Sequence, residues 1–129
     1  LVDYVGEIGD DQKAEFLGNA RALLFPIDWP EPFGLVMIES MAAGTPVIAW
    51  KNGSTPEVMD HGRSGYLVDS IDEAVDAVAR CATLPRTAVR DCFEQRFTAR
   101  HMAQAYVDLF DAATRAGRGA EPATFLIRA

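Results

Sequence analysis

The sequence is poor in the residues that bind metals or form disulfides. Its 129 residues include two cysteines and two histidines: Cys81, Cys92, His61 and His101. The cysteines lack Cys-x-x-Cys spacing and stand far from the histidines, so we expect two reduced thiols and no metal centre. No run of 18 apolar residues occurs, and no charged segment precedes an apolar one at the start, so we expect neither a membrane-spanning helix nor a signal peptide.

Positive charge is also scarce. Twelve Lys and Arg face 19 Asp and Glu, which gives a formal net charge of −7. This balance argues against electrostatic binding to nucleic acid or to an anionic membrane. The remaining composition is that of a globular protein, and the length suits one domain. We expect a cytoplasmic protein, with attachment to a membrane surface open for the full-length protein. Because the chain begins with Leu1 instead of Met, we also expect it to be part of a longer one.

Short apolar runs alternate with segments of helical pattern along the chain. The expected strands are Val2 to Ile8, Ala22 to Phe25, Val47 to Trp50 and Tyr66 to Val68. The expected helices are Asp10 to Asn19, Phe33 to Ala43, Pro56 to Asp60, Ile71 to Ala82, Thr87 to Gln95 and Thr98 to Gly117. This alternation predicts an α/β fold with a Rossmann-like parallel sheet and helices on both faces. Residues 1–116 would form the domain and residues 117–129 a tail.

Two of these helices carry apolar stripes. Ile71, Val75, Val78 and Ala82 recur at helical spacing, as do Met102, Tyr106, Leu109 and Ala113. Such stripes predict buried faces.

The start of the expected helix Phe33 to Ala43 has the pattern of an anion site. Glu31 precedes a proline and is therefore expected just outside the helix, with Pro32 at its first position. The N–H groups of Phe33, Gly34 and Leu35 would then lack helical acceptors and point outward with the positive end of the helix dipole. Phosphate is the most natural ligand for such a terminus. Glu31 could instead serve only to complement the helix dipole.

Glu39 lies further along the same helix, which is apolar nearly all round. A carboxylate in a buried helix needs a partner, and a buried arginine or a backbone donor could supply it. Glu39 is also roughly 12 Å beyond Glu31 at the helical rise. That separation fits a ligand with hydroxyl groups at both ends and an anion between them. A sugar joined through a diphosphate to a nucleoside has this layout.

A second loop, from Lys51 to Thr55, follows the next expected strand. In parallel sheets, ligands bind at the carboxyl ends of the strands, so the amides of Gly53 and Ser54 would face the same crevice. The same residues can alternatively be interpreted as a helix cap, with Ser54 and Glu57 forming a capping box.

The sequence resembles the retaining glycosyltransferases of the GT-B fold, in particular the large family 4 (group 1), in three blocks. These are Phe25-Pro26, then Glu31-Pro32-Phe33-Gly34-Leu35-Val36-Met37-Ile38-Glu39, then Ala43-Gly44-Thr45-Pro46-Val47-Ile48-Ala49. The family is marked by two glutamates with seven residues between them. Gly53-Ser54-Thr55-Pro56-Glu57 and Gly65-Tyr66-Leu67-Val68 fall where the family has its next blocks, and Ser54 replaces a glycine that is usual there.

The resemblance implies a partial C-terminal, donor-binding domain of a retaining, metal-independent enzyme without a cofactor. It transfers a sugar from a nucleotide-sugar to a sugar, lipid or small-molecule acceptor held by an N-terminal domain outside this chain. Glu31 would contact hydroxyls of the donor sugar and Glu39 the ribose. The amides of Phe33, Gly34 and Leu35 would face the sugar and diphosphate, with the loop of Gly53 and Ser54 nearby. No residue is assigned as catalytic, and the fragment alone is expected to be inactive.

The resemblance also has a structural consequence for the expected first strand. In a 3-2-1-4-5-6 sheet, Val2 to Ile8 would be the third strand, separated from Ala22 to Phe25 by two strands that this chain lacks. It would then be detached or an exposed edge, which predicts rearrangement or self-association of the fragment. The alternative function is a non-catalytic module that binds a nucleotide or sugar phosphate in the same crevice.

Overall fold

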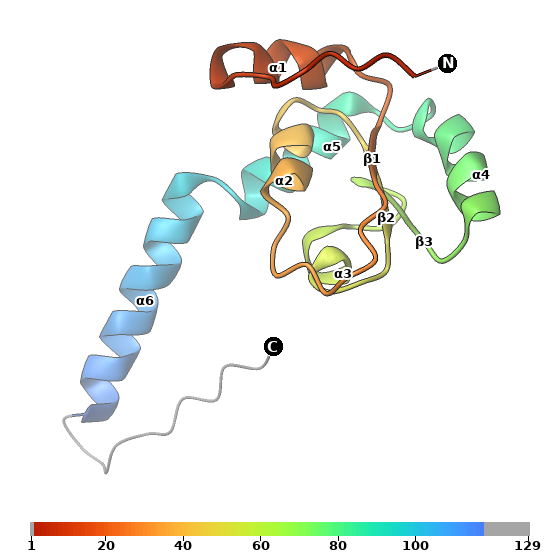
Figure 1. The fold of residues 1–129 in the computed structure, drawn as a ribbon. Helices are drawn as coiled ribbons and strands as arrows, with labels where there is room; N and C mark the ends of the chain where they lie inside the picture. The colour runs from red at the N-terminus through yellow and green to blue at the C-terminus, as the bar shows by residue number, and fades with distance from the viewer. Residues whose placement is uncertain (1, 118–129) are drawn as a thin grey trace. The chain divides into compact units, whose positions relative to one another are not determined.

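The computed structural model describes residues 2–117, and these fall into two compact units, Leu1–Gln95 and Arg96–Ala129. Each unit is described by itself. Figure 1 shows the first unit as a small sheet with helices around it, and the second as the long helix α6.

The first unit alternates strands and helices as the sequence predicts. Its strands are β1 (Leu23–Phe25), β2 (Val47–Trp50) and β3 (Gly65–Val68). Its helices are α1 (Asp10–Asn19), α2 (Leu35–Ala42), α3 (Thr55–Val58), α4 (Ile71–Cys81) and α5 (Arg86–Arg96, whose last residue falls in the second unit). The three strands form a parallel sheet in the order β1-β2-β3, so the expected α/β class is confirmed.

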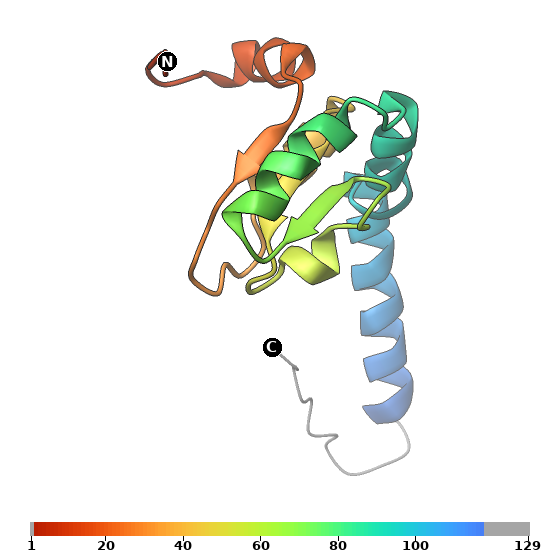
Figure 2. The ribbon, with the colours of Figure 1, turned by 90° about the vertical axis from the view of Figure 1, so that its right-hand side faces the viewer.

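Helices pack on both faces of this sheet. Side chains of a strand alternate between faces, and Ile48, Tyr66 and Val68 point to the face where Ala77 and Cys81 of α4 complete a buried cluster. On the opposite side α2 packs against β1 and β2, and its Met37 and Met41 are fully buried. Figure 2 shows α4 in front of the sheet and α2 behind it. The domain core is therefore two layers of helix around a short sheet.

The expected first strand is wrong. Residues 2–9 form no strand, and Val2 and Tyr4 are almost fully exposed. A strand needs a neighbour for its backbone hydrogen bonds. β1 pairs only with β2 among the described residues, which leaves Val2 to Ile8 detached from the sheet.

The two apolar stripes are also not buried as expected. In α4, Ile71 and Val75 are exposed, and the helix instead rests on the sheet through Ala77 and Cys81. The small side chains of Ala77 and Cys81 let the helix approach the sheet closely, and the larger ones of the stripe point away from this contact.

In the second unit, α6 runs from Ala99 to Gly117, and Thr98 Oγ1 accepts the N–H of His101, as expected for its N-cap. Met102, Tyr106 and Leu109 are exposed among the described residues, against the expectation of a buried face. Apart from Gly117, the predicted tail 117–129 lies outside the described residues.

Candidate functional site

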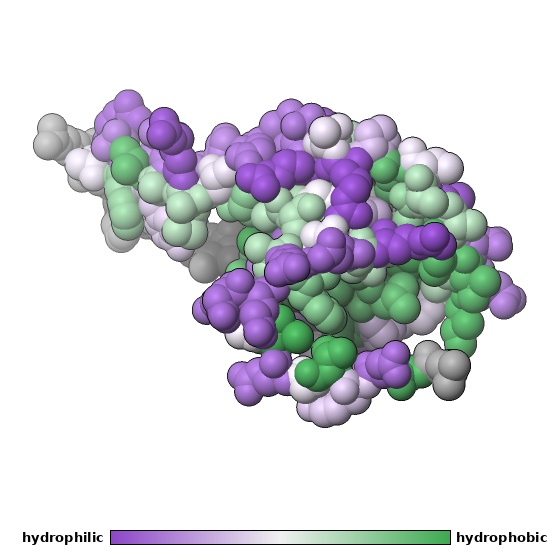
Figure 3. Space-filling model, turned by 90° about the horizontal axis from the view of Figure 1, so that it is seen from above, coloured by the Kyte–Doolittle hydropathy of each residue, from purple (hydrophilic) through white to green (hydrophobic). Residues whose placement is uncertain are grey.

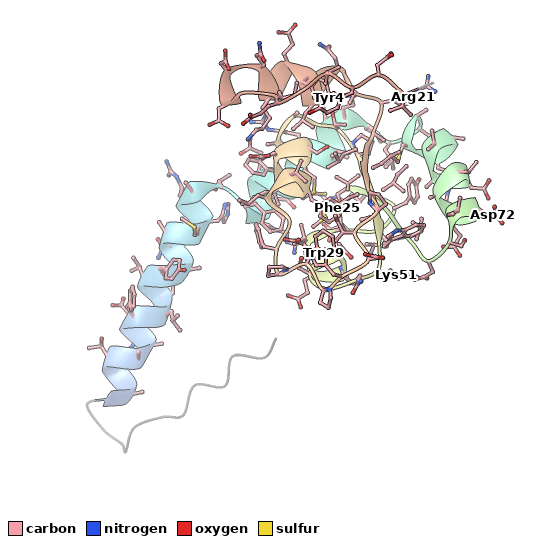
Figure 4. The ribbon with its side chains drawn as sticks, viewed as in Figure 1. Tyr4, Arg21, Phe25, Trp29, Lys51 and Asp72 are labelled. Carbon is pink, nitrogen blue, oxygen red and sulfur yellow. The ribbon has the colours of Figure 1, made fainter. Side chains whose placement is uncertain are left out.

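Two loops leave the sheet at the same end, where β1 and β2 have their carboxyl ends. One follows β1 and runs from Pro26 to Gly34, and the other follows β2 and runs from Lys51 to Ser54. Because β1 and β2 are adjacent and parallel, the loops begin side by side. Figure 4 shows Trp29 and Lys51 near this end of the sheet, with Arg21 at the other. The N–H of Ser54 donates to the carbonyl of Glu31 at 2.9 Å, so the predicted proximity of the two loops is confirmed.

Gly53 makes this contact between the loops possible. Its φ is +54°, in the left-handed region that favours glycine. A Cβ at this position would lie 2.4 Å from the backbone nitrogen of Glu31 and 2.7 Å from the carbonyl carbon of Pro30. Both neighbours are main-chain atoms that cannot move without shifting the loop. Gly53 therefore permits a close approach of one loop to the other.

The carboxylate of Glu31 is held by two N–H donors. The Gly34 amide donates to Oε1 at 3.2 Å, and the indole Nε1 of Trp29 donates to Oε2 at 3.3 Å. The backbone N–H of Glu31 donates to the Trp29 carbonyl at 2.8 Å. Trp29 was not among the site residues predicted from the sequence. The sequence signal that could have revealed this role is that Trp29 lies two residues before Glu31.

Helix α2 begins two residues after the expected start at Phe33 and three after Pro32. Its first residue is Leu35, so Pro32 does not occupy the first helical position, and Gly34 is the N-cap with φ +76°. The left-handed Gly34 turns the chain, and its Cβ would lie 2.6 Å from Met37 Cε and 3.2 Å from Phe25 Cζ. The prediction of three outward amides is wrong for Gly34, because the Gly34 amide already donates to Glu31.

Glu39 is half-exposed, with 35% of its side chain accessible, so its expected burial is wrong. Its partner is neither a buried arginine nor a backbone donor. Lys13 Nζ of α1 lies 2.9 Å from Glu39 Oε1 and 3.0 Å from Asp10 Oδ1. Hydrogen bonding to Glu39, and then to Asp10, raises the pKa of Lys13 above its usual 10.5. The ammonium therefore stays charged at neutral pH, and Glu39 Oε2 has no hydrogen bond to the described residues.

The capping box between Ser54 and Glu57 does not form. Ser54 is the N-cap of α3 but makes no side-chain cap, and its buried Oγ has no partner among the described residues. Thr55 orders the loop instead: its hydroxyl donates to the Trp50 carbonyl at 2.6 Å and accepts the Asn52 N–H at 3.0 Å. Sequence reasoning missed this role.

Two cavities of the first unit are lined by residues other than the two glutamates. One of about 560 Å³ borders α1 and is lined by Ile8, Gln12, Glu15, Phe16, Asn19 and Ala20. Figure 3 views the molecule from above α1 and shows purple hydrophilic side chains interspersed with green apolar ones. A smaller one of about 100 Å³ lies against the α4 face of the sheet, beside Leu24 and Trp50. Neither cavity is lined by Glu31 or Glu39. Glu31 precedes α2 and Glu39 lies within it, so these two residues are connected along the chain and not through these cavities.

The described part of the chain has neither a cluster of metal-ligating side chains nor a membrane-spanning helix. Residues 2–117 contain no group of three His, Cys, Asp or Glu side chains placed to hold a metal ion. Within the same range, no helix has both the length and the apolarity to cross a membrane.

Three known proteins show what the chain is similar to. A D-inositol 3-phosphate glycosyltransferase of Streptomyces avermitilis is 36% identical over 129 residues, which cover 92% of this chain and 27% of that protein. The sucrose-phosphate synthase structure from Thermosynechococcus elongatus matches with TM-score 0.66 and 32% identity over 85% of this chain and 30% of that one. Anabaena HepE in complex with UDP-glucose matches in fold, with TM-score 0.62 and 24% identity, over 76% of this chain and 29% of that one.

The chain thus spans under a third of the length of these proteins. Its fold is that of part of a GT-B glycosyltransferase, as the resemblance implied. The family model described as glycosyl transferases group 1 matches residues 2–92, which include both loops, Glu31 and Glu39. The chain belongs to the group 1 glycosyltransferases.

Proposed function

We propose that this chain is the donor-binding part of a retaining, metal-independent glycosyltransferase, which transfers a sugar from a nucleotide-sugar to an acceptor. The observation that carries the proposal is the pair of loops held together at the carboxyl ends of β1 and β2, with Glu31 oriented at their junction. Parallel α/β sheets bind their ligands at the carboxyl ends of the strands. The Anabaena HepE structures, which share the fold, hold UDP and UDP-glucose.

In this proposal Glu31 binds hydroxyls of the donor sugar. A carboxylate has about four acceptor positions, of which Trp29 and Gly34 use two, so acceptor capacity remains for sugar hydroxyls. Glu39 binds the ribose through its free Oε2. The Lys13 ammonium pairs with Oε1 and so holds the Glu39 carboxylate in place.

The diphosphate would lie between these glutamates, facing the amides of Phe33 and Leu35 and the loop of Gly53 and Ser54. The helix dipole of α2 and the oriented amides would stabilise charge on the departing diphosphate, which is the main catalytic requirement for breaking the sugar–phosphate bond. The orphaned Ser54 hydroxyl is one further donor close to this region.

Other parts of the proposal concern the protein that carries this chain. The acceptor, a sugar, lipid or small molecule, binds outside this chain, and the isolated chain is inactive. The protein is cytoplasmic or attached to a membrane surface, and does not bind nucleic acid.

The test is a thermal-shift panel of nucleoside diphosphates and their sugars on the protein that carries this chain. A ligand that binds only the folded state stabilises it by about 2.7 kcal/mol at a concentration one hundred times its Kd. We expect one nucleotide class to raise the melting temperature, and Glu39→Ala to abolish both that shift and sugar transfer. Transfer should survive EDTA and retain the anomeric configuration. If no nucleotide shifts the transition, the proposal is wrong; binding without turnover would indicate the non-catalytic module.

A further inference from the structure

Trp29 is an exposed aromatic residue whose polar group points at the candidate site. Its side chain lies on the loop after β1, with 54% of the residue accessible (Figure 4). A tryptophan combines a large apolar ring with one polar group, the indole N–H, which can hold a neighbouring acceptor. Here the indole Nε1 donates to Oε2 of Glu31 at 3.3 Å.

We propose that Trp29 is a positioning residue for the donor: its indole N–H fixes Glu31 in the orientation that meets the sugar hydroxyls. This inference rests on the proposed function and deepens it, because it names a residue that acts on the donor through Glu31. The geometry supports it in two ways. The Gly34 amide takes the other carboxylate oxygen, so the two donors together fix both the position and the rotation of the carboxylate plane.

The backbone of the same loop is fixed independently. The Glu31 N–H donates to the Trp29 carbonyl, and the Glu31 carbonyl accepts the Ser54 N–H. Because the main chain is held on both sides of Glu31, only its side-chain torsions can still vary. The hydrogen bond from the Trp29 indole restricts these torsions. Loss of the indole N–H would leave Glu31 in place but turning among several orientations.

The variant that tests this is Trp29→Phe, which keeps an aromatic ring and removes the N–H. In the protein that carries this chain, we expect a rise of roughly three- to tenfold in the KM for the nucleotide-sugar with kcat nearly unchanged, since one long hydrogen bond to an exposed carboxylate is lost. Tyr4→Phe is the matched control, because Tyr4 is 93% exposed and lies before α1, at the opposite end of the sheet from Trp29 (Figure 4). It should leave KM unchanged.

A double-mutant cycle with Glu31→Ala separates positioning from direct contact. If Trp29 acts through Glu31, Trp29→Phe has no further effect in the Glu31→Ala background. An equal rise in KM in both backgrounds would overturn the inference, and so would a Trp29→Phe protein indistinguishable from the parent.

The failure of the proposed function gives a different result. If Glu31→Ala alone leaves donor binding unchanged, the assignment of the site itself is wrong, and the positioning role falls with it. A spectroscopic measurement adds an independent readout. Trp29→Phe removes one indole from the protein that carries this chain, so the difference between the fluorescence of the parent and that of the variant reports on Trp29. Donor binding should then change the fluorescence of Trp29, and an unchanged difference spectrum at saturating donor would contradict the inference.

Discussion

The two glutamates of the candidate site are held by different kinds of group. Glu31 accepts two neutral N–H donors, from Gly34 and Trp29, whereas Glu39 faces the charged ammonium of Lys13. A neutral donor orients a carboxylate without cancelling its charge, while an ion pair also lowers its field. The carboxylate at the sugar end of the proposed site thus keeps its full charge, whereas Lys13 compensates part of the charge at the ribose end, where it also pairs with Asp10.

Gly53 gives the most direct prediction at this scale. Gly53→Ala would force a side chain into the left-handed region and place its Cβ 2.4 Å from the Glu31 nitrogen. We expect a loss of about 1–3 kcal/mol in the free energy of unfolding and weaker donor binding, measured by urea titration and thermal shift.

Gly18→Ala is the matched control. Gly18 lies inside α1, and a Cβ there meets nothing within 4 Å. Because alanine is the better helix former, this variant should be more stable by about 0.5–1 kcal/mol. If both variants shift stability equally, the contact between the loops has no special requirement for glycine.

At the scale of elements, α1 depends on a residue from the far end of the unit. Arg86 of α5 donates to the carbonyls of Ala20 and Gly18 at the C-terminus of α1, and to the Thr45 hydroxyl. The Thr45 hydroxyl in turn donates to the Leu17 carbonyl. These bonds satisfy carbonyls at the end of the helix, of which that of Leu17 also accepts the Ala20 N–H. The positive charge of Arg86 complements the helix dipole. α1 also carries Lys13, so Arg86 helps to hold the partner of Glu39.

Arg86→Met should therefore destabilise α1 locally. We expect a loss of about 1 kcal/mol in the free energy of unfolding and faster amide exchange in α1 than in β2, measured by hydrogen exchange with mass spectrometry. Arg21→Met is the control, because Arg21 is exposed and makes no hydrogen bond to the described residues. Equal exchange in both variants would show that Arg86 does not hold the helix.

The elements themselves were largely predictable. Strands β2 and β3 and helices α1, α4 and α5 lie within a residue or two of the expected ranges, because their apolar patterns are strong and local. The start of α2 was missed because a left-handed Gly34 overrides the preference of Pro32 for a first helical turn. Long-range partners were beyond sequence reasoning: the 26-residue separation of Lys13 and Glu39 leaves no local pattern.

At the scale of the whole molecule, the sheet has an open edge. β1 pairs only with β2 among the described residues, and Leu24 of β1 is 61% exposed. An unpaired strand with apolar side chains around it is a site of association. Val2 to Ile8 was predicted to be detached or an exposed edge; it is detached in the structure, and β1 is left as an edge strand.

We therefore expect this 129-residue chain to self-associate as its concentration rises, measured by light scattering after size exclusion. Leu24→Lys should weaken the association, because charge on an edge strand opposes pairing. Tyr4→Lys is the control in the detached segment. A chain that is monomeric at every concentration would contradict the prediction. Association weakened only by Tyr4→Lys would show that residues 2–8, and not β1, form the contact between copies.

The contact between the two loops consists of main-chain atoms on both sides. The bond runs from the Ser54 amide to the Glu31 carbonyl, and Gly53 contributes no side chain to it. Such a junction is indifferent to most substitutions around it. The side chains of Lys51 and Asn52 take no part in this bond, so they could be exchanged while the backbone of Glu31 stays in register. The lining of the proposed site is thus open to change without rebuilding its frame.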